Sequence, residues 1–131
     1  MEVVLLKTFI LFVTTINVIC LFMHEFDAFY VEEWKMLGFL KSLKSRTQYL
    51  VFLYFHVFFC GFFFYYLWSV FHFINFPLWI GINVLGVLHL IIHLIARKWE
   101  TNVFKSFSSF LFIGGAAVTG MINLIFYSYY L

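Results

Sequence analysis

The chain alternates between long apolar runs and short polar segments. Apolar residues dominate over residues 8–31, 49–68, 76–96 and 107–127, and most charged residues lie outside these runs. Each run is long enough to cross a hydrocarbon core of about 30 Å as a helix that rises 1.5 Å per residue. Because the backbone inside a bilayer must satisfy its own hydrogen bonds, we predict an all-α fold, an integral membrane four-helix bundle in one domain over residues 1–131.

The composition points to the same class of protein. Of the 131 residues, 65% are hydrophobic and only 11% are charged, whereas soluble domains carry about 25% charged residues. We therefore expect a multi-pass protein of the cell membrane, with the lipid bilayer as its partner. The net charge of +2 indicates no nucleic acid, because the basic residues lie in the connecting segments. Cys20 and Cys60 lie in apolar runs and are expected to be buried, without a disulfide.

The basic residues predict an orientation. They lie almost entirely in two connecting segments that four spans would place on one face: Lys35, Lys41, Lys44 and Arg46 in the first, and Arg97, Lys98 and Lys105 in the second. Only Lys7 falls on the other side. The positive-inside rule places the two segments in the cytoplasm and both termini on the extracytoplasmic side.

The last run contains a patch of small residues: Gly114, Gly115, Ala116, Ala117 and Gly120. Ala116 and Gly120 have the spacing that lets two helices approach closely. One interpretation is packing within the bundle. The other is a face for a homo-oligomer or a membrane partner.

Ionisable residues inside the apolar runs fall at one depth. His24 precedes Glu32 by eight residues, and His89 precedes Arg97 by eight. His56 follows Gln48 by eight residues, which places the three imidazoles about 12 Å below the same membrane edge. Ionisable side chains in spans face the bundle interior and pair with one another.

The spacing of these residues predicts a metal site. His89 and His93 are four residues apart and share a helix face, as do His24 and Asp27 at three residues. An HxxxH pair on one helix can hold a metal if other helices supply the remaining ligands. The candidate ligands are His24, His56, His89 and His93. Glu25 and Asp27 are the candidate catalytic groups, each as a general base or as an orienter of a histidine. Glu32 and Glu33 are expected at the membrane interface.

Five short motifs along the chain carry a resemblance: His24-Glu25-x-Asp27-Ala28, Glu33-Trp34-x-x-Leu37, Phe55-His56, His89-x-x-x-His93 and Asn102-x-Phe104-x-Ser106. Together they resemble a family of small bacterial four-span membrane proteins of unknown function. More distantly, the pattern is similar to the HXXEE-motif membrane family, whose polar residues are thought to form an intramembrane catalytic site. The resemblance implies a polar site but no reaction.

Three functions stay open, and the sequence does not decide whether the protein is an enzyme. The first is a metal-dependent membrane hydrolase of a lipid amide or ester, with zinc favoured over iron or haem as the cofactor. The second is a b-type haem protein with His56 and His89 as axial ligands. The third is a non-catalytic partner or assembly subunit, in which the polar residues only form interhelical hydrogen bonds.

Overall fold

The structure, a computed structural model, describes residues 2–72, 75–100 and 102–130. The elements in order are α1 (Glu2–Tyr30), the short 3-10 helices η1 (Glu33–Met36) and η2 (Gly38–Leu40), α2 (Ser45–His72), α3 (Phe76–Ala96) and α4 (Phe107–Tyr130). The described residues contain no strand, and four of their helices are long and apolar enough to cross a membrane. The predicted all-helical fold with four candidate spans is confirmed. The bounds of α3 agree with the sequence pattern, whereas α1 and α2 begin earlier than predicted.

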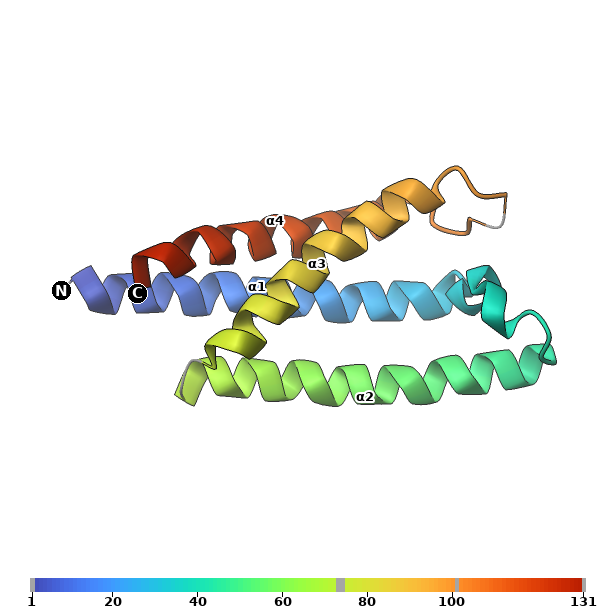
Figure 1. Cartoon of the computed structure of the whole chain (residues 1–131), viewed down its shortest axis with the longest axis horizontal. Coiled ribbons are helices and arrows are strands. Elements are labelled where there is room, and N and C mark those ends of the chain that lie inside the picture. Colours follow the sequence, from blue (N-terminus) through green and yellow to red (C-terminus); the bar gives the residue numbers. More distant parts are fainter. Residues whose placement is uncertain (1, 73–74, 101, 131) are drawn as a thin grey trace.

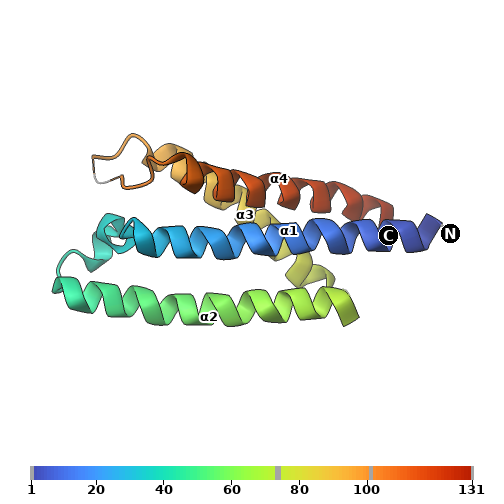
Figure 2. The same ribbon diagram turned by 180° about the vertical axis from the view of Figure 1, so that it is seen from behind.

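The four long helices pack unevenly. Helix α1 lies between α2 and α4, and α3 crosses diagonally from the end of α2 to the start of α4 (Figure 1). Seen from behind, α4 runs along α1, with α3 beyond them (Figure 2). Helix α4 packs closely on α1 and α3, whereas α2 contacts α1 sparsely and α3 very little. The start of α1 and the end of α4 lie at one end of the bundle, called here the termini end, and the segments 31–44 and 97–106 form the loop end.

Small residues bring the helices of the compact part together. A Cβ on Gly86 would lie 3.5 Å from the Ala116 carbonyl oxygen, and one on Gly120 would lie 3.0 Å from that of Asn83. Helices α3 and α4 therefore meet backbone to backbone, as small residues permit in membranes. Ala116 and Ala117 are buried within the single chain. Packing between helices of the same chain thus buries much of the predicted small-residue patch.

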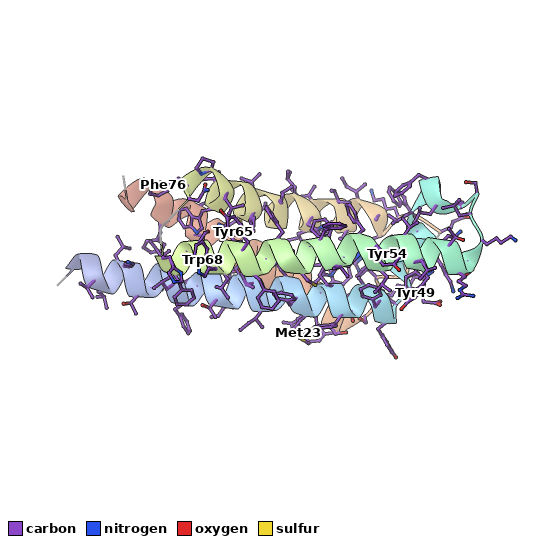
Figure 3. The ribbon with its side chains drawn as sticks, turned by 90° about the horizontal axis from the view of Figure 1, so that it is seen from below. Met23, Tyr49, Tyr54, Tyr65, Trp68 and Phe76 are labelled. Atoms are coloured by element: carbon purple, nitrogen blue, oxygen red, sulfur yellow. The ribbon has the colours of Figure 1, made fainter. Side chains whose placement is uncertain are left out.

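The outer surface of α2 is aromatic at both ends. Tyr49 and Tyr54 lie toward the loop end, and Tyr65 and Trp68 toward the termini end (Figure 3). All four are exposed in the single chain. Tyrosine and tryptophan are enriched at the two membrane interfaces, where one side of the ring is apolar and the polar tip reaches water. This distribution is what a helix spanning a bilayer would present.

A left-handed residue ends α1 and turns the chain back over the bundle. Glu32 has φ 58° and ψ 46°, a conformation that is uncommon for residues other than glycine. The short helices that follow bury Trp34, Met36 and Leu40. These side chains belong to a second apolar cluster that also includes Phe104. The segment after α1 is therefore a lid over the loop end of the helices.

A network of neutral polar groups lies nearer the termini end. The amide nitrogen of Asn83 donates to the Tyr66 hydroxyl at 3.0 Å, and that of Asn123 donates to the Asn83 side-chain oxygen at 3.0 Å and to the Thr14 hydroxyl at 3.2 Å. The Asn17 amide donates to the Ala116 carbonyl oxygen at 2.8 Å. Thr14, Asn17, Tyr66, Asn83 and Asn123 are called here the amide network, and each is almost completely buried.

Candidate metal centre

Three imidazoles from two helices converge at the loop end. His24 lies on α1, and His89 and His93 lie one turn apart on α3. The Nε2 atom of His89 lies 2.8 Å from that of His24 and 3.0 Å from that of His93. One ligand nitrogen from each of the three lies within 4.8 Å of the others. In a tetrahedral zinc site with bonds of about 2.1 Å, ligand nitrogens lie about 3.4 Å apart. The three residues, called here the histidine cluster, can therefore hold one ion with small adjustments.

The surroundings of the histidine cluster are dry. His24 is 2% exposed and His93 is 3% exposed. The ring of Phe104, from the segment before α4, lies 5.4 Å from the His24 ring and 4.2 Å from the His93 ring. In the described part of the chain, the Nδ1 atoms of His24 and His93 are buried and have no hydrogen-bond partner. Buried polar atoms are normally paired, so hydrogen bonding within the protein does not by itself account for these imidazoles.

Glu33 approaches the cluster from η1. Its Oε1 atom lies 3.7 Å from the Nε2 atom of His93. Burial, and then the nearby Glu25, raise the pKa of Glu33 to about 7, so that its carboxyl group can gain or lose a proton near neutral pH. The sequence did not identify Glu33 as a site residue. Its position depends on the left-handed turn at Glu32, which no pattern of residue types revealed.

Glu25 and His56 form a separate pair. The Nε2 atom of His56 lies 2.8 Å from the Oε2 atom of Glu25, and both side chains are nearly buried. The Nδ1 atom of His56 lies 2.7 Å from the Phe52 carbonyl oxygen. A carbonyl oxygen only accepts, so Nδ1 carries a proton, and the contact between Nε2 and Oε2 must contain a second one. The pair therefore holds a proton between its two partners, and His56 does not belong to the group of three converging imidazoles.

Asp27, a residue of α1, lies against the first turn of α4. The hydroxyl groups of Ser108 and Ser109 both donate to its carboxylate, that of Ser108 at 3.4 Å. The Ser106 hydroxyl accepts the backbone N–H of Ser109 at 3.1 Å and so caps the helix. A carboxylate is favoured at a helix N-terminus by the helix dipole. The structure thus gives Asp27 a capping contact between α1 and α4, one turn from His24.

A cavity of about 660 Å³ adjoins the histidine cluster. It lies between α1, α2 and α3 and beneath the lid. Its polar lining comes from five side chains: His24, Glu25, Glu33, His56 and His89. The rest of the lining is apolar apart from backbone atoms, and much of it is phenylalanine and leucine. Ligand sites commonly have this form, with a few convergent polar groups in a largely apolar cavity.

Comparison with known proteins gives a family but no activity. No curated protein and no solved structure matches the chain. The profile of a family of unknown function (DUF6713) matches residues 8–130, which is nearly the whole chain and includes all the residues of the candidate site. The chain therefore belongs to this family of unknown function, DUF6713.

Proposed function

We propose that this protein is a metal-dependent membrane hydrolase in which His24, His89 and His93 bind one divalent ion. The observation that carries the proposal is the convergence of three imidazoles, with one ring nitrogen from each within 4.8 Å of the others, at the wall of a cavity. Imidazole nitrogens suit zinc, and a site with three protein ligands leaves one position for water or substrate. The cavity is mostly apolar, so the substrate class is a lipid ester or amide.

The neighbouring acids supply the remaining chemistry. Zinc lowers the pKa of a bound water to about 7 and polarises a carbonyl group. Glu33, 3.7 Å from His93, is placed to accept a proton from that water or to bind the ion itself. The Glu25–His56 pair faces the same cavity and holds a proton that it can deliver to a leaving group. In this scheme Glu33 is the general base and the Glu25–His56 pair is the general acid.

The geometry is less suited to the other two functions. A haem with two histidine ligands needs imidazoles on opposite sides of a porphyrin, but His89 Nε2 lies within 3.0 Å of two imidazoles, and His56 is engaged by Glu25. A purely structural subunit would not need imidazoles at the wall of a cavity, whereas His24 and His89 line one.

The proposal includes an orientation. Residues 31–44, 97–100 and 102–106 contain six of the eight basic residues and lie at the same end of the bundle, and Arg46 lies in the first turn of α2 at that end. The positive-inside rule favours this end in the cytoplasm, so the metal centre would face the cytoplasmic leaflet. A reporter fused after Leu131 should then be active only in its extracytoplasmic form. If a reporter that works only in the cytoplasm were active after Leu131, the proposed orientation would be wrong.

Elemental analysis of gently purified protein tests the metal site. We expect about one zinc ion per chain in the wild type and almost none in His89→Ala. His72→Ala is the matched control, because His72 is exposed at the far end of α2, and its metal content should equal that of the wild type. A wild type without stoichiometric metal after growth with zinc, iron or manganese would contradict the proposal.

A further inference from the structure

The cavity beside the histidine cluster is polar at one end and apolar along the rest of its length. Its five polar side chains lie toward the loop end. Its apolar lining continues along α2 to Phe63 and along α3 to Ile82, both toward the middle of the bundle. The lining residues of α2 run from Val51 to Phe63, about 18 Å at 1.5 Å per residue. The cavity is therefore long as well as amphipathic.

The cavity opens sideways. Six of its lining side chains are exposed on the outer faces of α2 and α3: Val51, Phe55, Phe62, Leu85, Leu88 and Ile92. Helix α2 contacts α3 very little beyond the turn that joins them. Both helices are candidate membrane spans, so this opening faces the hydrocarbon of the bilayer and not water. What reaches it from outside is lipid.

The depth of the polar end matches a particular part of a lipid. The spans of α1 and α2 have 27 and 28 residues, about 40 Å, which equals the bilayer thickness including both interfaces. His24 lies six residues before the end of α1 and His89 seven before the end of α3, about 10 Å below the helix ends. The hydrocarbon boundary lies about 5 Å below those ends, since the apolar core is about 30 Å thick. The polar groups thus lie about 5 Å inside that boundary, just below the level of the glycerolipid ester groups.

We propose that one acyl chain of a bilayer glycerolipid enters between α2 and α3 and lies along the apolar part of the cavity. Its ester carbonyl then lies between the histidine cluster and the Glu25–His56 pair. The chemistry at the ester rests on the function proposed above, whereas the binding of the chain does not need the metal. Hydrolysis there would join a water oxygen to the acyl carbon and break the ester C–O bond. The freed alcohol oxygen would take a proton from the Glu25–His56 pair, one water proton would replace it on the pair, and the other would stay with the acid, leaving a fatty acid and a lysolipid.

Photolabelling in vesicles tests the route. The full-length protein is reconstituted in phosphatidylcholine vesicles that contain a small fraction of phosphatidylcholine with a diazirine at the end of one acyl chain. After illumination, labelled residues are mapped by mass spectrometry, and bound metal is measured on the same sample. We expect labelling of Phe63 and Ile82, which are 7% and 2% exposed and which lipid around the bundle does not reach. Their labelling should exceed that of exposed Leu111 and Val118 on α4.

A pair of variants sharpens the result. Leu88→Trp narrows the lateral opening, and Leu111→Trp adds the same bulk to a similarly exposed position on α4. The first should lower labelling of Phe63 and Ile82 several-fold, and the second should leave it unchanged. If Leu88→Trp does not fold, the wild-type labelling pattern alone decides.

The two proposals can fail separately. Metal without labelling inside the cavity would overturn the lipid route and leave the metal centre standing. Labelling inside the cavity without metal would support the route and contradict the hydrolase. Equal labelling of the cavity and of α4 would mean only general contact with lipid, and the route would be wrong.

Discussion

The bundle contains two buried polar regions that differ in chemistry and in access. The amide network, nearer the termini end, is built from neutral side chains and lies where α1, α3 and α4 pack closely. The histidine cluster, nearer the loop end, is built from imidazoles with carboxyl groups beside it. None of the amide-network residues lines the large cavity, whereas His24 and His89 do.

The two regions do not differ in whether their buried polar atoms all have hydrogen-bond partners. The amide network leaves the side-chain oxygens of Asn17 and Asn123 without a partner in the described residues, just as the histidine cluster leaves two Nδ1 atoms. The difference lies in what the groups can do. Amides neither titrate near neutral pH nor compete well for zinc, whereas imidazoles do both.

The comparison teaches that polarity inside a membrane bundle is not enough to indicate a site. Asn83 joins three neighbours through its amide group and fixes how α2, α3 and α4 align. The histidines join α1 to α3, but two of them, His24 and His89, also line the large cavity. A functional role for the histidine cluster is favoured because its ring nitrogens converge and because a cavity gives access to them.

Substitution of one residue in each region should separate their roles, and this is the largest effect we expect. His89→Asn should lower metal affinity at least about 100-fold, the upper range for loss of a metal-supporting group, but should change the unfolding free energy of the metal-free protein by less than about 1 kcal/mol. Asn83→Leu should do the reverse, with normal metal content and a loss of about 1–2 kcal/mol from its broken hydrogen bonds. Zinc titration and unfolding in detergent measure the two quantities. If both variants lowered stability equally and neither changed zinc affinity, both regions would be structural hydrogen-bond networks.

Acidification should also distinguish the regions. Histidine ligands bind metal in their neutral form, and an ordinary imidazole has a pKa of about 6.5. Because burial disfavours the charged imidazole, the test must extend to low pH, and zinc affinity should fall at least about tenfold between about pH 7.5 and about pH 4. The stability contributed by the amide network should not change, since amides do not titrate. Zinc affinity measured across this range checks the first part, and the effect of Asn83→Leu on stability at both pH values checks the second. A zinc affinity independent of pH would rule out histidine ligands.

The last pair of variants concerns packing around the amide network. A Cβ at position 120 would lie 3.0 Å from the Asn83 carbonyl oxygen, whereas one at Gly81 would meet no described atom within 4 Å. Gly120→Ala should therefore cost about 1–3 kcal/mol through overpacking. Gly81→Ala should be neutral or slightly stabilising, because alanine favours helix more than glycine. Thermal unfolding in detergent ranks the two variants, and equal midpoints would show that α3 and α4 are less closely packed than described.

The sequence predicted the helices well because membrane spans are specified by residue type and length. It also predicted that His24 and His89 lie at a similar depth, because helical rise converts spacing into distance. It did not predict that His56 pairs with Glu25 or that Asp27 contacts two serines in the first turn of α4. Those contacts depend on how far α2 separates from α3 and on where the segment after Asn102 returns to the bundle. The amide network was visible only as scattered polar residues such as Asn17 and Asn123 in apolar runs.

X-ray absorption at the zinc edge of the purified, lipid-reconstituted protein tests the central claim most directly. The account predicts three imidazole nitrogens at about 2.0–2.1 Å, completed by an oxygen ligand. The imidazole signal should disappear in His89→Ala. Zinc coordinated mainly by oxygen, or by imidazoles in the same number in wild type and His89→Ala, would contradict a metal centre formed by His24, His89 and His93.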